Sequence, residues 1–304
     1  MSVIWGIPYF LIKVAVGELT PITLVFLRCV VAAAILLPFG AYRGNLAAVR
    51  PHWRVLLAYT AVEVAIPWVV LSWAETHVSS SLTGLLVGSV PLFGVILARL
   101  AGSEEQFTGR RLVGLLVGFL GVASVVGLNV TGHDAAGIAG LALVAVGYAL
   151  GPMIISRRLQ GVPAEGVVAF SLAVPALVYA PLGIAQFPSG GLSGKVILAV
   201  GTLGAVCTVA AFLMFFALIA EVGPVRATFI TYVNPAVALA VGAIILRERI
   251  TAGEIGGFVL IVAGLALATR RRDSGSDASD MPAVVPDPAV AELHAPEGSH
   301  QAAG

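Results

Sequence analysis

The chain has 304 residues, of which 59% are hydrophobic and only 11% are charged, and its mean hydropathy is +1.00. Soluble globular proteins carry roughly 25% charged residues, so the composition excludes an ordinary soluble domain and indicates a protein of the lipid bilayer. The net charge of +1 hides a basic body and an acidic tail, because six of the sixteen acidic residues and no Lys or Arg follow residue 272. No basic cluster with interleaved aromatic residues lies outside the apolar segments, so we expect no nucleic-acid partner.

Apolar stretches of membrane-spanning length follow one another along residues 1–272. A spanning helix needs about 20 apolar residues, because the hydrocarbon core is about 30 Å thick. Six long stretches contain no Asp, Glu, Lys or Arg: residues 76–98, 112–133, 135–156, 166–194, 196–220 and 227–246. Four others are shorter or interrupted by charge: residues 3–16, 21–41, 53–74 and 252–269. We therefore expect an all-α integral membrane protein with ten transmembrane helices.

The distribution of positive charge predicts the orientation, because connections rich in Lys and Arg stay cytoplasmic. With the N-terminus inside, twelve Lys and Arg residues fall in cytoplasmic connections. Only four fall in outward connections, namely Lys13, Lys195, Arg247 and Arg249. This favours a multi-pass protein of the plasma membrane with both termini in the cytoplasm. Residues 273–304, rich in Ser, Pro, Ala, Gly and acids, are expected to form a disordered cytoplasmic tail.

The two cysteines, Cys29 and Cys207, lie within apolar runs rather than in connections. We expect both to be small buried apolar residues, and neither a disulfide nor a metal site. The sequence contains no ATP-binding P-loop pattern, so any pumping must draw on an ion gradient or a partner. No cofactor is expected.

An internal repeat divides the body of the chain into two halves. Residues 78–121 read VSSSLTGLLVGSVPLFGVILARLAGSEEQFTGRRLVGLLVGFLG, and residues 222–264 read VGPVRATFITYVNPAVALAVGAIILRERITAGEIGGFVLIVAG. Pro91 and Pro235 each lie 13 residues after the start of their copy, and one extra residue in the first copy aligns Glu105 with Glu248. Each half then holds five helices, and an odd number of spans inverts the second half in the membrane. The predicted halves are residues 1–132 and 133–272.

The repeated residues resemble the EamA domain of the drug/metabolite transporter superfamily. The second copy is the cleaner match and contains Asn234, Pro235, Glu248, Thr251, Gly257 and Gly264. The opening helices also match, with Trp5 and Gly6 followed by Pro21 and Arg28. This resemblance covers residues 1–272 and implies a ten-helix, two-domain transporter of small molecules, with its substrate cavity between the halves.

Inverted repeats are characteristic of secondary transporters, in which one bundle rocks against the other around a midplane site. We therefore interpret the chain as an exporter of small metabolites or drugs that works by alternating access, with protons as a coupling ion to be tested. An intramembrane enzyme and a channel are the alternatives from other classes. The spans contain no HExxH, GxSxG or Asp-rich pair, which argues against an enzyme. Ring-like filters or Gly-rich re-entrant loops, which a channel would need, are not evident.

Two ionisable residues lie deep within the expected spans. Inserting a charged group at mid-bilayer costs at least about 2.5 to 3.5 kcal/mol on insertion scales, so each such residue indicates a role in packing or function. Glu63 lies 10 residues after Trp53 and 11 before Ala74, near the middle of its span. Arg28 lies at a similar depth in the preceding span, so the two residues can pair. Glu63 is a candidate proton site, whereas Arg28 can serve substrate binding or helix packing.

Polar and aromatic side chains at mid-depth are the other substrate-site candidates. They are Trp68, Tyr148, Tyr179, Tyr232 and Asn234. Each can line an apolar cavity with a few polar contacts or can simply pack. Pro91 and Pro235 predict matched helix breaks, which are tolerated where freed backbone groups line a cavity. Lys13, in the last turn of the first span, is expected to extend outward to the membrane interface.

Glycines with small-xxx-small spacing recur in the fifth and tenth expected spans. They are Gly114, Gly118 and Gly121, and Gly256, Gly257 and Gly264. Such spacing lets helices approach closely. We expect these glycines to pack helices within a monomer, with packing in a homodimer as the alternative.

Overall fold

A computed structural model of the chain describes residues 2–102, 109–127, 134–222 and 233–269. These residues are helical and contain no strand. The first half comprises α1 (Ser2–Gly6), α2 (Pro8–Ala15), α3 (Pro21–Tyr42), α4 (Asn45–Val49), η1 (Arg50–His52), α5 (Trp53–Tyr59), η2 (Thr60–Ala65), α6 (Ile66–Ala74), α7 (Ser80–Val87), α8 (Val90–Leu100) and α9 (Gly109–Gly127). The second comprises α10 (Asp134–Arg158), α11 (Ala164–Val178), α12 (Ala180–Ala185), α13 (Gly194–Gly204), η3 (Ala205–Ala210), α14 (Ala211–Val222), α16 (Asn234–Ile244) and α17 (Ala252–Thr269).

In the part of the chain that the structure describes, five helices are long and apolar enough to cross a membrane: Pro21–Tyr42, Asn45–Ala74, Ser80–Leu100, Asp134–Arg158 and Gly194–Phe215. Shorter apolar helices cover Val3–Ala15, Leu112–Val126, Ala164–Val178, Asn234–Ile244 and Ala252–Leu267. Each of the ten expected spans overlaps one of these ranges. The chain is therefore a multi-pass helical membrane protein, and the crossing of the shorter helices stays a prediction.

Several expected spans are broken helices rather than continuous ones. The stretch 76–98 was expected to be one span with a break at Pro91; α7 ends at Val87 and α8 begins at Val90, with Pro91 in its first turn. Within the stretch 166–194, α11 ends at Val178 and α12 begins at Ala180, with Pro181 in the first turn of α12. In each case proline lacks the backbone donor that would continue the preceding helix and fits the first turn of the next.

Side-chain caps fix the starts of several helices. Thr20 and Ser79 accept backbone N–H groups of α3 and α7, from Thr23 at 3.3 Å and from Leu82 at 3.1 Å. At α17, the Thr251 hydroxyl accepts the Glu254 N–H at 3.2 Å, while the Glu254 carboxylate accepts the Thr251 N–H at 2.7 Å. This reciprocal capping box satisfies two donors that a helix start leaves unpaired.

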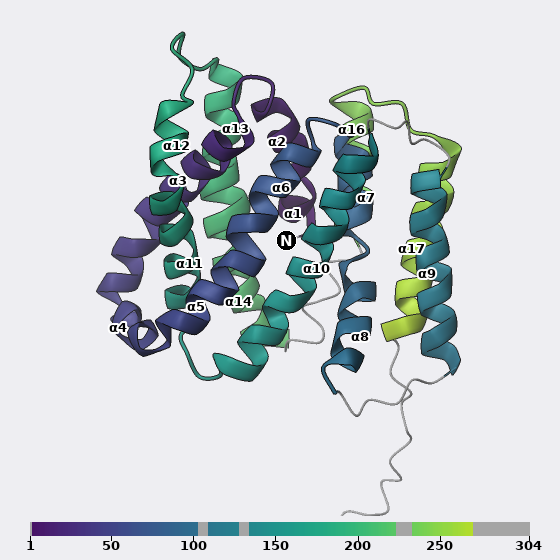
Figure 1. The fold of residues 1–304 in the computed structure, drawn as a ribbon, viewed down its shortest axis with the longest axis horizontal. Coiled ribbons are helices and arrows are strands. Elements are labelled where there is room, and N and C mark those ends of the chain that lie inside the picture. The colour runs from purple at the N-terminus through teal and green to yellow at the C-terminus, as the bar shows by residue number, and fades with distance from the viewer. Residues whose placement is uncertain (1, 103–108, 128–133, 223–232, 270–304) are drawn as a thin grey trace, which may run out of the picture. The chain divides into compact units, whose positions relative to one another are not determined.

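Helices from the two halves pack side by side (Figure 1). The pairs in contact are α3 with α11, α7 with α16, and α9 with α17. The α9–α17 contact is made by glycines: a Cβ built on Gly264 would lie 2.5 Å from the Gly114 carbonyl oxygen, and one on Gly257 would lie 2.7 Å from that of Gly121. These four glycines therefore pack two helices of one chain together, as expected. Gly256 differs, because a Cβ there would meet no atom within 4 Å.

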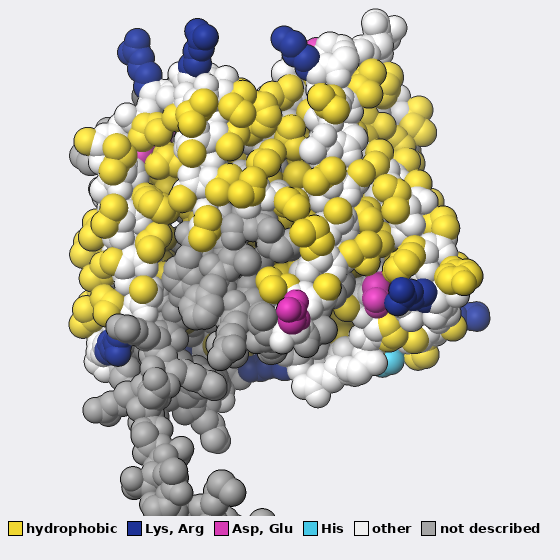
Figure 2. Space-filling model, turned by 180° about the vertical axis from the view of Figure 1, so that it is seen from behind, with side chains coloured by type: hydrophobic (Ala, Val, Ile, Leu, Met, Phe, Trp, Pro, Cys, Tyr) yellow, Lys and Arg dark blue, Asp and Glu magenta, His cyan; other side chains and the backbone are white. Residues whose placement is uncertain are grey.

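The surface has the distribution of apolar side chains that a bilayer requires. Figure 2 shows hydrophobic side chains gathered over the middle of one face, with Lys and Arg side chains at its upper and lower edges. Large apolar residues of α9, such as Leu112, Leu116 and Leu120, are more than half exposed. Water would oppose such exposure, whereas lipid chains favour it. Cys29 and Cys207 are both buried free thiols, as expected.

Candidate functional site

A partly buried arginine joins three segments in the middle of the bundle. Arg28 of α3 places its guanidinium carbon 3.7 Å from the centre of the Trp68 ring of α6. Its Nε donates a hydrogen bond to Thr208 Oγ1 of η3 at 3.1 Å. The Thr208 hydroxyl in turn donates to the carbonyl of Leu203 at 2.7 Å. A guanidinium stacked on an indole face is stabilised by the ring quadrupole, most strongly where water is excluded.

Glu63 does not form the ion pair with Arg28 that the sequence allows. The contacts of Arg28 are Trp68 and Thr208, and the Oε2 atom of Glu63 is buried without a hydrogen-bond partner in the described part of the chain. Glu63 instead lies against α10, where a Cβ built on Gly151 would come within 2.7 Å of its carboxyl carbon. The two side chains therefore contact different neighbours.

Glu63 and Thr208 occupy equivalent places in two π-helical segments. η2 reads TAVEVA and η3 reads AVCTVA, so Glu63 and Thr208 are each the fourth residue and each precedes Val-Ala. A π-helical turn widens the helix and is frequent at functional sites. Thr60 Oγ1 of η2 and Ser171 Oγ of α11, which packs on η2, are also buried without a hydrogen-bond partner among the described residues. Buried polar groups therefore gather around η2 without forming hydrogen bonds to one another.

The aromatic candidates lie around the same region. Tyr148 of α10 packs against both central apolar clusters and interacts electrostatically with Glu63 and Arg28. Trp68 belongs to the cluster that surrounds Arg28, and Tyr179 packs against it from the junction of α11 and α12. Tyr148, Trp68, Arg28 and Glu63 are thus brought together. Tyr232 lies outside the described residues.

The two proline sites lie close to each other. Pro235 is the second residue of α16, directly after Asn234. A Cβ built on Gly88, in the break between α7 and α8, would come within 2.4 Å of Pro235 Cγ. A Cβ on Gly6 of α1 would meet the Asn234 carbonyl oxygen at 3.0 Å. The break before Pro91 and the start of α16 therefore pack directly on one another, with α1 alongside.

A second group of charged side chains lies where α2, α6 and α16 end and α7 begins. Lys13 was expected to extend to the membrane interface, but its Nζ donates to the carbonyls of Glu75 and Val78, the latter at 2.7 Å. The Glu248 carboxylate accepts the backbone N–H groups of Ser80 at 2.9 Å and Ser81 at 3.0 Å. We call Lys13, Glu75 and Glu248 the charged end cluster.

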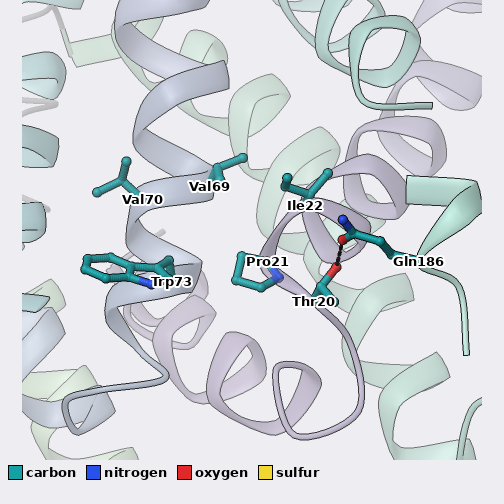
Figure 3. Close-up of a pocket in the computed structure, with 7 residues that line it drawn as sticks. All are labelled: Thr20, Pro21, Ile22, Val69, Val70, Trp73 and Gln186. Carbon is teal, nitrogen blue, oxygen red and sulfur yellow. Dashed lines mark hydrogen bonds between the residues drawn. The ribbon is translucent and has the colours of Figure 1, made fainter. Parts of the chain in front are cut away.

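A pocket of about 280 Å³ lies away from these groups, between the start of α3 and the end of α6 (Figure 3). Its lining is Thr20, Pro21, Ile22, Val69, Val70, Trp73 and Gln186. The Thr20 hydroxyl donates to the Gln186 side-chain oxygen at 2.6 Å across its rim. With one satisfied polar pair and an otherwise apolar wall, this pocket can hold hydrocarbon but offers no polar group for recognition.

Three contributors escaped the sequence interpretation. Thr208 is a neutral hydroxyl in a run without charge, and only an alignment of TAVEVA with AVCTVA would have shown that its position is equivalent to that of Glu63. Glu75 follows its apolar run directly and therefore resembled an exposed loop residue, yet it is fully buried. Glu248 belonged to the repeat, but its role in capping α7 depends on packing. Among the described residues no three His, Cys, Asp or Glu side chains gather as metal ligands would.

These features define a class: a polytopic helical membrane protein whose buried polar groups lie at breaks in its helices. Within that class the chain belongs to the EamA-like transporter family, whose sequence profile matches residues 1–127 and again residues 135–270. The chain is therefore a membrane transporter with a small-molecule substrate.

Named relatives agree with this assignment. The chain is 28% identical over 280 residues to the uncharacterized inner membrane transporter YedA of Escherichia coli K12, with 88% of each chain covered. It is 25% identical over 284 residues to an uncharacterized transporter of Archaeoglobus fulgidus, covering 88% of this chain and 95% of that one. Its fold is similar to that of a protein of known crystal structure, with a TM-score of 0.65 and 25% identity over 88% of this chain and 94% of the other.

Proposed function

We propose that the protein is a secondary active exporter of small metabolites or drugs. In this proposal residues 1–132 and 133–272 are inverted five-helix repeats, the ten helices all cross the plasma membrane, and both termini are cytoplasmic. The two halves alternate around a central site between them. Whether the protein acts as a monomer or a homodimer does not alter this scheme.

One observation carries the proposal: the two halves each place a π-helical segment with a polar fourth residue, Glu63 or Thr208, at the same point of a spanning helix. The two separate matches to the family profile support the same division of the chain. The equivalent pairs α3 with α11, α7 with α16 and α9 with α17 are what a twofold relation between the halves would produce. Inverted repeats of this kind place the substrate near the midplane.

The polar groups near η2 and Arg28 suit a site that is apolar with a few directed contacts. Arg28 offers a cation held by Trp68 and Thr208, and Glu63 offers a carboxyl with an unpartnered buried oxygen. Burying a polar group without a hydrogen bond costs free energy, so such groups persist where a ligand, a proton or water satisfies them in part of the cycle. In this scheme Glu63 binds a coupling proton, while Arg28, Tyr148, Tyr179, Tyr232 and Asn234 contribute to the substrate site.

The test is profiling of small molecules in the medium and cells of a bacterial strain that expresses the protein, at two external pH values. Wild type, Glu63→Gln and an empty vector are compared at matched membrane levels. Glu221→Gln is the control variant, because Glu221 is an exposed carboxylate at the end of α14. We expect a solute to accumulate outside with wild type and Glu221→Gln, in a manner that depends on the pH gradient, and Glu63→Gln to fall to the level of the empty vector.

Equal profiles for wild type and the empty vector would refute export. Wild-type efflux that Glu63→Gln retains in full would refute the proton role of Glu63 alone. Flux that rises without saturation as the internal solute is raised would favour a channel, and a chemically altered solute without net movement would favour an enzyme.

A further inference from the structure

The charged end cluster ties together the ends of helices from both halves. Lys13 connects the end of α2 to the connection between α6 and α7, through the carbonyls of Glu75 and Val78. Glu248 connects the turn after α16 to the start of α7, where it accepts the N–H groups and hydroxyls of Ser80 and Ser81. A carboxylate at a helix N-terminus is favoured by the helix dipole and by the free N–H groups there. These two ties join the helix ends at this point, and we call this tied arrangement the closed end.

Glu75 lies inside this end and has no hydrogen bond for its carboxyl group. It is 0% exposed, and neither Oε1 nor Oε2 has a hydrogen-bond partner among the described residues. An ionised carboxylate in this position would lose its hydration without replacement, which is far more costly than burying a neutral acid. Burial raises the pKa of Glu75 well above its ordinary value, Lys13 opposes that rise, and Glu248 adds to it. The closed end therefore favours the protonated acid.

The groups that face Glu75 have opposed effects on its charge. Besides Lys13 and Glu248, Tyr9 of α2 interacts with it electrostatically. His77 follows in the same connection, with its ring tilted against the Trp73 ring at the surface, 4.5 Å between centroids. Asp134 lies in the first turn of α10, the helix whose Gly137 lies against His77 and Val78. From α7 the neighbours are neutral hydroxyls. Within the described part of the chain, Lys13 is the basic group that lowers the pKa of Glu75, and it is already engaged with two carbonyls.

We propose that Glu75 is a proton-binding residue that controls the opening of this end of the transporter, which the charge distribution predicts to be the outward one. When Glu75 is protonated, Lys13 stays on the two carbonyls and Glu248 stays on α7, and the end is closed. When Glu75 releases its proton to the outside solution, the new carboxylate repels the Glu248 carboxylate, so the tie from Glu248 to α7 weakens and the end opens. Lys13 moves from the Val78 carbonyl onto the Glu75 carboxylate and remains bound to the connection between α6 and α7.

The role of this step in transport rests on the proposed function, but the step itself is measured without substrate. The reporter is a cysteine at Val78, which is 5% exposed and whose backbone carbonyl stays in place. The comparator is a cysteine at Thr76, which is exposed in the same connection. Purified full-length protein in nanodiscs is labelled with a charged maleimide, and the Val78→Cys rate is divided by the Thr76→Cys rate to cancel the reagent's own pH dependence. The parent protein corrects for Cys29 and Cys207.

We expect this ratio to rise at least about threefold between about pH 6 and about pH 8, because one titrating carboxyl can change a two-state ratio by up to about tenfold per pH unit. In a Glu75→Gln background, which mimics the protonated acid, the ratio should stay low and flat. A ratio that is flat with Glu75 present, or that rises equally in Glu75→Gln, would overturn the proposal.

Thermal unfolding of otherwise unaltered protein gives a second measurement if a cysteine variant folds poorly. A carboxyl whose pKa is raised in the folded state stabilises that state at low pH, and the stabilisation is lost as pH rises through the folded pKa. The Tm of wild type should therefore fall relative to that of Glu75→Gln as pH increases, and parallel curves would contradict proton binding by Glu75. A pH-dependent labelling ratio in a protein that exports no solute would support the proton site at Glu75 and refute export. Export with a labelling ratio that does not change with pH would support export and refute the proton site at Glu75.

Discussion

The Arg28 guanidinium is held in an apolar interior by one ring face and one hydroxyl, so the hydroxyl matters more than its size suggests. Thr208→Val keeps the shape of the side chain and removes the acceptor for Arg28 Nε. Leaving a buried donor unsatisfied costs about 1–3 kcal/mol, and more when the donor is charged. We expect Thr208→Val to lower the free energy of unfolding of the purified protein by about 1–3 kcal/mol, and therefore to lower its Tm.

Thr208→Ser is the matched control, because it keeps the acceptor and loses only a methyl group. Its Tm in the same detergent should stay close to that of wild type. If Thr208→Val had the same Tm as Thr208→Ser, the hydrogen bond from Arg28 to Thr208 would contribute nothing to stability, and Arg28 would be held by Trp68 alone.

At this scale the sequence predicts which residues matter better than it predicts what they touch. A charge inside an apolar run is visible at once, so Arg28 and Glu63 stand out. Their partners depend on how α3 and η2 pack against the other helices, which counting along the chain does not fix, and the ion pair that the count allowed does not form. Glu75 shows the converse, since a charge at the edge of an apolar run resembles a loop residue until the packing of α2, α7 and α10 buries it.

At the scale of elements, glycine spacing predicts contact faces well. The stripes on α9 and α17 signalled close approach, and the helices do meet through Gly118 and Gly264. Breaks within helices were predicted less well. Pro91 predicted the break after α7, but the π-helical segments η2 and η3 contain no proline or glycine within their bounds.

A substitution pair in α17 tests the close approach. Gly264→Ala would place a Cβ 2.3 Å from the Gly118 nitrogen and 2.5 Å from the Gly114 carbonyl oxygen, so the backbones must separate. Overpacking of this kind costs about 1–3 kcal/mol. We expect a lower Tm and less folded protein in membranes.

Gly256→Ala lies on the open side of the same helix, where a Cβ meets nothing within 4 Å. Alanine is favoured over glycine in a helix by about 0.5–1 kcal/mol, so this variant should be as stable as wild type or slightly more stable. Equal destabilisation by both variants would mean that helix flexibility, rather than the α9–α17 contact, requires glycine in α17.

At the scale of the whole molecule, the broken segment α11–α12 decides whether the inverted topology holds. α11 has 15 residues and α12 has six. At about 1.5 Å per residue, α11 alone falls short of the hydrocarbon thickness of about 30 Å, whereas α11 and α12 together reach it. If they form one crossing, the connections before and after them lie on opposite sides of the membrane. That crossing is needed to give the second half its odd number of spans.

Two cysteine reporters measure this directly in intact cells. Gly190→Cys lies in the connection between α12 and α13, where the new side chain meets no atom within 4 Å, and Gln160→Cys lies at an exposed position between α10 and α11. With the N-terminus inside, an impermeant maleimide should label Gly190→Cys at once and Gln160→Cys only after the membrane is permeabilised. Cys29 and Cys207 are buried and give a low background. The reverse pattern would invert the orientation, and equal labelling of both from outside would remove the crossing and with it the inverted repeat on which alternating access depends.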